Sequence, residues 1–350
     1  MRAALGAAML LVVLLGGSPA AAAAQQAPLI AAAGDISCTP PNPDYNNGFG
    51  IPTACQQRAT SDLLSLHEWA AVLPLGDLTY DDKAAPAGLQ SSYEPTWGRW
   101  KLASHPVIGN HDYDDGLGGK SYWDYWNGVG VARGRAGTRG RGWYAYDVGS
   151  WRLIALNSNC RRVRCNWDSA QVRFLRHELD RRSGQCVLAY FHHPRFSSGV
   201  YEETDVEPGG TEKTVRLAGI WKALYRGGAD VVINGHDHLY ERFAPQTPGG
   251  LLSKQPGVAQ FTVGTGGYSL HPFGDLAPNS RFRQNTSFGI LAMRLYPDRY
   301  AWNFMAVPDG HSLDSGSRPC HRELPKPKHH HHRRHHNGRS ARAAALSRDG

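Results

Sequence analysis

The sequence predicts an α/β fold, and three observations lead to that prediction. Apolar runs of strand length recur along the 350 residues, amphipathic helical patterns lie between them, and glycine-containing turns close several of the runs. Strands that alternate with helices are typical of α/β proteins. No internal repeat and no Pro/Gly-rich linker divides the body, so we expect one domain over residues 27–322.

The strand-length runs are spread over most of this body. They are Leu29–Ala33, Val72–Leu75, Trp151–Leu156, Val187–Phe191, Asp230–Ile233, Phe261–Val263, Ile290–Leu295 and Ala301–Ala306. Helical spacing of apolar residues predicts helices over 168–182 and 214–226. Asp168, with Gln171 three residues later, is the expected N-cap of the first helix.

Three long segments have no regular pattern: Thr39–Pro52, Asp114–Gly142 and Ser197–Gly210. Loops of this length in a compact domain are usually functional or disordered. The second holds the aromatic cluster Tyr122–Trp126. Its rings would either stack on a nucleotide base or an aryl leaving group, or pack as a flap, and we favour the packed flap.

The two ends of the chain differ in composition from the body. A basic start, an apolar run over Ala7–Gly16 and small residues up to Ala24 predict a signal peptide over residues 1–24. The run is too short for a comfortable membrane span, so we expect secretion and no span after cleavage. Residues 323–350 form a basic, His-rich stretch that we expect to be a disordered tail. Capture of metal or of an anionic surface by this tail is the alternative.

The net charge of +8 belongs mainly to the tail. The segment Leu324–Gly350 carries +6 and Arg2 adds one more, which leaves about +1 for the body. The charge therefore gives no reason to expect a nucleic-acid partner for the folded part.

Six cysteines fit an exported chain, in which they would form disulfides. Many connectivities are open. Proximity favours Cys38–Cys55 and Cys160–Cys165, and Cys186–Cys320 is the pair that remains. The spacing of the cysteines does not fit a CxxC zinc site.

Five short segments carry side chains that bind metals, each where an apolar run ends. They are Gly34-Asp35, Gly76–Tyr80, Gly109–Asp112, Phe191–Pro194 and Gly235–His238. Because ligands in open α/β sheets collect outside the carboxyl ends of strands, we expect these side chains to meet at one edge. The candidate ligands are Asp35, Asp77, Tyr80, Asn110, His192, His236 and His238.

The order of these segments resembles the calcineurin-like metallophosphoesterases. The stretches Gly76–Tyr80, Phe191–Phe196 and Gly235–Arg242 are similar to the purple acid phosphatase branch, as is Tyr144–Gly149. The resemblance runs from about Gly34 to Arg242 and implies the catalytic domain alone. It also implies the metallophosphoesterase fold, a four-layer sandwich of two mixed β-sheets flanked by helices.

Carried over residue by residue, the resemblance implies two metal ions. Fe(III) is expected at Asp35, Asp77, Tyr80 and His238, and a divalent Fe, Zn or Mn ion at Asp77, Asn110, His192 and His236, so that Asp77 bridges the two. The ligand types agree, because a carboxylate- and phenolate-rich pocket suits a hard trivalent ion and imidazole suits a divalent one. Tyr80 is the discriminating residue; its alternative role is packing beside the site.

The same resemblance implies hydrolysis of small-molecule phosphate monoesters by a metal-bound hydroxide. His111 is expected to stabilise or protonate the leaving oxygen, with Asp112 holding its imidazole, and His193 is a candidate substrate contact. Phosphodiesters and nucleotides are the alternative substrates. A binding protein that keeps the fold without the chemistry is a more distant alternative. The oligomeric state is open.

Overall fold

The computed structural model describes residues 26–80, 85–182, 184–200, 216–253 and 257–321. The expected signal peptide (1–24), the tail (323–350) and most of the Ser197–Gly210 segment lie outside these residues. Among the helices described, none combines the length and the apolar character that a membrane crossing requires.

The first of two large sheets has five strands. Their spatial order is β14 (His311–Pro319), β13 (Arg299–Ala306), β12 (Gly289–Leu295), β1 (Leu29–Ala33) and β2 (Ala71–Pro74). Strand β1 pairs in parallel with β2 and antiparallel with β12. The sheet is therefore mixed, and β2 forms its edge.

The second sheet has seven strands and is also mixed. Their order is β11 (Ser280–Gln284), β9 (Tyr240–Gln246), β10 (Val258–Val263), β8 (Val231–Asn234), β7 (Cys186–Tyr190), β6 (Trp151–Ala155) and β5 (Tyr144–Val148). The central strands β10, β8, β7 and β6 run parallel, whereas β5 and β9 are antiparallel to their neighbours.

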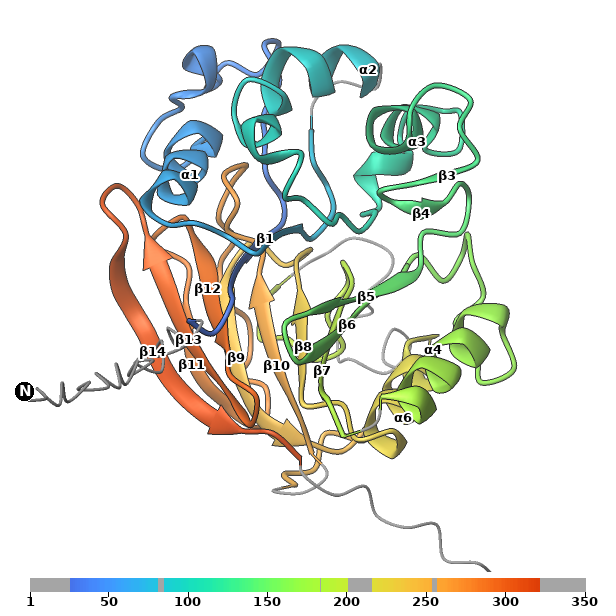
Figure 1. The fold of residues 1–350 in the computed structure, drawn as a ribbon. Helices are drawn as coiled ribbons and strands as arrows, with labels where there is room; N and C mark the ends of the chain where they lie inside the picture. The colour runs from blue at the N-terminus through green and yellow to red at the C-terminus, as the bar shows by residue number, and fades with distance from the viewer. Residues whose placement is uncertain (1–25, 81–84, 183, 201–215, 254–256, 322–350) are drawn as a thin grey trace, which may run out of the picture.

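Side-chain alternation along β7 explains how the layers pack. Leu188 and Tyr190 join the core that the two sheets share, which also contains residues of β1 and β12. Val187 and Ala189 point to the opposite face and pack under α4 (Ala170–Arg181) and α6 (Ala218–Arg226). These two helices lie side by side on that outer face (Figure 1). Helix α1 (Gln57–Leu63) packs near β12. The predicted fold, two mixed sheets flanked by helices, is confirmed.

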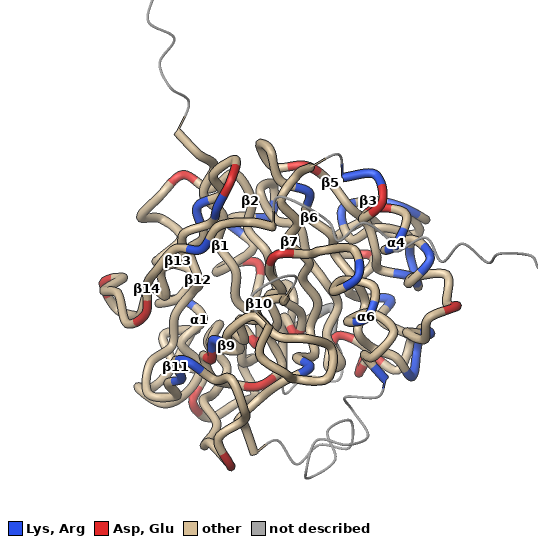
Figure 2. Tube along the Cα trace, turned by 90° about the horizontal axis from the view of Figure 1, so that it is seen from below, with Lys and Arg blue, Asp and Glu red and all other residues tan. Residues whose placement is uncertain are grey.

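The remaining elements are short. They are α2 (Ala85–Gly88), α3 (Lys120–Asn127), the β3–β4 hairpin (Arg133–Gly134 with Gly137–Thr138) and single helical turns at Asn46–Gly48, Leu64–Leu66, Leu89–Tyr93, Trp97–Trp100 and His111–Tyr113. Basic and acidic positions are interspersed over the described trace (Figure 2), in keeping with a body of low net charge.

All eight strand-length runs of the sequence form strands, with ends shifted by up to three residues. The first predicted helix is also present, but its predicted cap is wrong by one residue. Ser169 is the N-cap, because its Oγ accepts a hydrogen bond from the backbone N–H of Val172 at 3.2 Å. The second predicted helix is present as α6, Ala218–Arg226, and the first two residues of its predicted range lie outside the described residues.

The aromatic segment within Asp114–Gly142 is not a loop throughout. Residues 120–127 form α3, and Tyr122, Trp123 and Trp126 are buried in the shared core. Packing against the core, rather than exposure for stacking on a substrate, is thus the role that the structure supports. The three expected disulfides, Cys38–Cys55, Cys160–Cys165 and Cys186–Cys320, are all formed.

Candidate metal centre

The candidate ligands lie in turns that leave two different sheets. Asp35 and Asp77 follow β1 and β2 in the five-stranded sheet, whereas His192 and His236 follow β7 and β8 in the seven-stranded sheet. The two sets of turns touch, since a Cβ on Gly34 would lie 3.3 Å from the Cα of Gly235. The site is therefore formed where two sheets meet, and the expectation of a single sheet edge is wrong.

Three of these residues have left-handed backbone conformations. The φ angles of Asp35, Asp77 and His236 are 62°, 51° and 72°. Such conformations cost about 1–3 kcal/mol each in non-glycine residues and cluster at functional sites. The turns after three strands therefore hold strained positions that the surrounding structure must stabilise.

Two glycines allow these turns to approach one another. A Cβ on Gly109 would lie 2.0 Å from Asp77 Oδ1, and a Cβ on Gly76, which has a φ of 93°, would lie 2.9 Å from His192 Nδ1. Any side chain at either position would collide with a candidate ligand. The Gly-Asp and Gly-Asn pairs of the motifs thus have a steric cause.

The first ligand group surrounds the hydroxyl of Tyr80. This oxygen lies 2.8 Å from Asp35 Oδ1, 2.9 Å from Asp77 Oδ2 and 3.0 Å from His238 Nε2. All four side chains are buried, with Tyr80 the most exposed at 6%. One hydroxyl proton cannot satisfy two carboxylates and an imidazole at once, so a cation fits the chemistry of this donor set.

The second group surrounds Nε2 of His192. This atom lies 3.0 Å from Asn110 Oδ1, 3.1 Å from Asp77 Oδ2 and 3.2 Å from His236 Nδ1. His236 Nδ1 is in turn 3.0 Å from Asn110 Oδ1. His192 Nδ1 lies 2.8 Å from the carbonyl of Leu75 and donates to it, so Nε2 is the ring nitrogen that faces these acceptors. Although burial opposes its charge, the Asp77 carboxylate raises the pKa of this ring to about 9, so a bound metal would take the place of the Nε2 proton. A cation would satisfy this group too.

The electrostatics of the site favour an ionised Asp77 and positive charge beside it. Burial opposes ionisation of Asp77, but the neighbouring imidazoles of His192 and His111 hold its pKa well below the usual range. Burial and the neighbouring His193 and His192 lower the pKa of His236, which keeps this imidazole neutral and able to ligate.

His111 and Asp112 lie beside the two groups, and Asp112 does not have the role expected of it. The backbone N–H of His111 donates to Asp77 Oδ1 at 2.8 Å, and its ring packs against Tyr80 with centroids 4.6 Å apart. The ring Nδ1 lies 2.8 Å from Asp114 Oδ2. The expectation that Asp112 orients the His111 imidazole is corrected, because the carboxylate on that ring is Asp114.

Asp112 instead ties two ligand turns together. Its carboxylate accepts hydrogen bonds from the backbone N–H groups of Asp77, Leu78 and Gly109, at 3.0, 3.0 and 2.8 Å. Burial and the Asp77 carboxylate raise its pKa to about 7. Asp112 is thus placed to hold the Gly76 and Gly109 turns in register.

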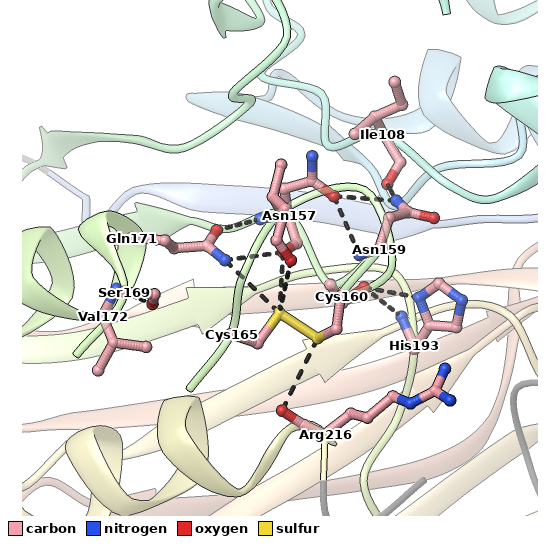
Figure 3. Close-up of a disulfide and its surroundings, with 12 residues drawn as sticks. Ile108, Asn157, Asn159, Cys160, Cys165, Ser169, Gln171, Val172, His193 and Arg216 are labelled. Atoms are coloured by element: carbon pink, nitrogen blue, oxygen red, sulfur yellow. Dashed lines mark hydrogen bonds between the residues drawn. A yellow bond between two sulfur atoms is a disulfide. The ribbon is translucent and has the colours of Figure 1, made fainter. Parts of the chain in front are cut away.

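His193 is buried next to the second group. Its ring centroid lies 4.4 Å from that of His236, and its Nδ1 lies 2.7 Å from Ser158 Oγ. Ser158 Oγ also accepts the backbone N–H of His193 at 2.9 Å. Ser158 lies in the loop between β6 and α4, two residues before the Cys160–Cys165 disulfide of the same loop (Figure 3). The neighbouring Asn159 donates to the carbonyl of Ile108 at 3.1 Å, so this loop joins both sides of the site.

The motifs missed one segment that contacts the first group, Tyr268–His271. The Tyr268 ring stacks on Tyr80 with centroids 3.8 Å apart, and Ser269 Oγ lies 2.9 Å from His238 Nδ1. The available signal was the Gly264–Gly267 turn that directly follows the run Phe261–Val263, as glycine turns follow the other ligand-bearing strands.

The structure therefore brings all seven predicted ligands together in two groups that share Asp77. The ligand atoms of Asp35, Asp77 and His192 lie within 4.8 Å of one another, as do those of His192, His193 and His236. An α/β sandwich that gathers carboxylate, phenol, amide and imidazole side chains where two sheets meet forms a candidate two-metal centre, the kind of site that metal-dependent hydrolases use.

Comparison with known proteins agrees with this class. Residues 30–240 match the calcineurin-like phosphoesterase family, and the chain belongs to that family. It is 26% identical to purple acid phosphatase 21 of Arabidopsis thaliana over 271 residues, which are 70% of this chain and 55% of that protein. It is 24% identical to purple acid phosphatase 23 of the same plant, over 52% of this chain and 44% of that protein.

A solved structure is similar at the level of the fold. The purple acid phosphatase PPD1 from yellow lupin superposes with a TM-score of 0.61 and 19% identity, covering 83% of this chain and 53% of that one. The chain spans about half the length of the curated relatives it matches. The chain therefore belongs to a phosphoesterase family, and that family implies two metal ions, for which the two ligand groups are the candidate sites.

Proposed function

We propose that this chain is a secreted, purple acid phosphatase-like enzyme that hydrolyses phosphate monoesters at a two-metal centre. The observation that carries the proposal is the position of the Tyr80 hydroxyl, within 3.0 Å of Asp35, Asp77 and His238. A phenolate among hard oxygen ligands is the feature that favours a trivalent ion over an all-divalent pair.

In this proposal, Asp77 serves both metals. Its Oδ2 is 2.9 Å from the Tyr80 hydroxyl and 3.1 Å from His192 Nε2, so one carboxylate borders both ligand groups. Fe(III) would be held by Asp35, Asp77, Tyr80 and His238, and divalent Fe, Zn or Mn by Asp77, Asn110, His192 and His236. When bound, the two ions supply Lewis-acid chemistry that draws charge from the phosphoryl oxygens and acidifies water.

The chain's own residues would orient the ester and handle its protons. His111, at 23% side-chain exposure, is accessible to a substrate, and Asp114 is placed to hold its ring. His111 would donate to the leaving oxygen. Ser158 Oγ accepts the backbone N–H of His193 and has its own proton to donate to His193 Nδ1, which leaves Nε2–H to bind a phosphoryl oxygen.

Secretion is supported by composition and by the disulfides. Three disulfides form among the six cysteines, and an apolar run with small residues after it opens the chain. Disulfides of this kind persist in oxidising compartments outside the cytosol. The sequence similarity to purple acid phosphatases supports the choice of monoesters as substrates.

Paired substrates test the reaction class directly. The metal-loaded protein is assayed on an aryl phosphate and on the matching bis-aryl diester, with Asp77→Asn as the inactive control. We expect kcat/KM for the monoester to exceed that for the diester by at least about tenfold, a difference of about 1.4 kcal/mol in transition-state free energy. A preference for the diester would support the phosphodiesterase alternative, and no turnover of either would support a binding protein.

A further inference from the structure

The second ring nitrogen of each candidate histidine ligand decides which tautomer the ring adopts. In His192 this nitrogen, Nδ1, lies 2.8 Å from a backbone carbonyl, that of Leu75. In His238 it lies 2.9 Å from a side chain, the Oγ of Ser269. Metal-ligating histidines usually donate this second N–H to a partner, which orients the ring and fixes its tautomer.

We propose that Ser269 is a positioning residue for His238 at the metal centre, an inference that rests on the proposed function. When Ser269 Oγ accepts the Nδ1–H of His238, the lone pair is left on Nε2. That atom lies 3.0 Å from the Tyr80 hydroxyl and 3.4 Å from Asp35 Oδ1, within the first ligand group. Ser269 therefore selects the tautomer that can bind the metal.

Ser269 is itself held in place from several sides. Its backbone pairs with Ala54, and the next residue, Cys55, donates its N–H to the carbonyl of Tyr268 at 2.9 Å. Cys55 forms a disulfide with Cys38, three residues after the ligand Asp35. The Ser269 hydroxyl has His271 Nε2 as an acceptor for its own proton at 3.3 Å. The hydroxyl thus has a defined position and a defined orientation.

The residues on either side of Ser269 contact two ligand rings of the first group, those of His238 and Tyr80. His271 stacks on His238 with ring centroids 4.1 Å apart, and its backbone N–H donates to the carbonyl of His238 at 2.9 Å. Tyr268 stacks on Tyr80 at 3.8 Å with the planes 9° apart. All of these contacts are to ligands of the first group, so the loss of Ser269 should affect one metal more than the other.

Metal retention under a chelator separates the two sites. The wild-type protein, Ser269→Ala and Ser269→Thr are loaded with metal and titrated with chelator, and each element is quantified. We expect Ser269→Ala to bind one of its two metals about 10- to 100-fold more weakly and to retain the other, because this is the usual effect of losing such a partner. Ser269→Thr keeps the hydroxyl and should retain both.

Ser317→Ala is the matched control. Ser317 lies on strand β14, away from the site, and its hydroxyl donates to the backbone carbonyl of Tyr300. Circular dichroism checks that each variant is folded. A wild-type protein that binds two metals, with a Ser269→Ala variant that retains both equally well, contradicts the inference alone. A wild-type protein that binds no metal contradicts the proposed function and this inference together. Failure of Ser269→Thr to restore retention also contradicts the role of the hydroxyl.

Discussion

At the residue scale, the candidate metal centre depends on glycines, which lack a Cβ atom, as much as on the ligands themselves. Asp35, Asp77 and His236 occupy left-handed backbone positions, and Gly109 leaves room for the Asp77 carboxylate. Ligand geometry is therefore set by turn sterics before any metal binds. Substitutions that leave every ligand in place should still damage the site.

We predict that Gly109→Ala abolishes function although the variant keeps every proposed ligand. The added methyl group would lie 2.0 Å from Asp77 Oδ1 and must displace it. A displacement of about 1 Å in a catalytic group costs about 100-fold in rate, so we expect at least that loss, with loss of metal. Gly249→Ala is the control, since its nearest atom, Thr247 Oγ1, lies 3.9 Å away. Normal metal content and rate in Gly109→Ala would contradict this steric account.

His111→Ala should separate chemistry from metal binding. Because its side chain contacts Tyr80 and Asp114 without belonging to either ligand group, we expect metal content to be unchanged. The value of kcat should fall by about 10²- to 10⁴-fold, as for loss of a general acid. His177→Ala, an exposed position on the outer helix α4, serves as the control. Full turnover by the metal-loaded His111→Ala variant would exclude the assigned role.

At the scale of elements, short loops connect the strands to the site. The loop between β6 and α4, which contains the Cys160–Cys165 disulfide (Figure 3), carries Ser158 to His193 and Asn159 to the carbonyl of Ile108. Helix α4 then follows directly with its cap at Ser169. One loop with an internal disulfide thus contacts a candidate substrate-binding residue and leads into the start of a helix.

Removal of this disulfide should weaken substrate binding. For the double variant Cys160→Ser and Cys165→Ser, we expect KM to rise because His193 loses its fixed partner Ser158. The free energy of unfolding should fall by about 2 kcal/mol, the loop-entropy value for so short a loop. Steady-state kinetics and denaturant unfolding measure the two effects. An unchanged KM with reduced stability would show that the loop has only a structural role.

Many of the strands and most of the candidate ligands could be predicted from the sequence, and those that could not were missed for physical reasons. Buried strands such as β7 are continuous apolar runs and were found, whereas β11 and β14 alternate with exposed polar residues and were not. The five ligand segments stand out because each needs a glycine or a histidine at a strand end. Ser269 was missed because a serine that orients a ligand has no spacing of its own, and Asp114 because its contact depends on the His111 turn.

At the scale of the whole molecule, the two sheets also meet away from the metal centre. His105 follows the segment that pairs with β2, and its ring stacks on Tyr146 of β5 with centroids 3.9 Å apart. Burial, together with the charge of Arg135, lowers the pKa of His105 to about 4. This residue joins the edges of the two sheets in its neutral form.

The free energy of unfolding should therefore decrease as the pH is lowered from 7 to 5. In the unfolded chain His105 titrates near its usual value of 6.5, so below that pH the unfolded state binds a proton that the folded state excludes until about pH 4. The free energy of unfolding should drop by about 2 kcal/mol between pH 7 and pH 5 from this group. The His105→Phe variant keeps the stacking on Tyr146 and has no imidazole to protonate, so its free energy of unfolding should decrease by that much less over the same pH range. Equal pH dependence in urea unfolding of both proteins would contradict the prediction.

Metal analysis combined with a visible spectrum tests the central claim most directly. If Tyr80 ligates Fe(III) beside Asp35, Asp77 and His238, the purified protein contains two metals per chain, one of them iron, and absorbs near the middle of the visible range. Tyr80→Phe should lose that band. An active wild-type protein that is colourless and free of iron would contradict the assignment of Tyr80 as a ligand.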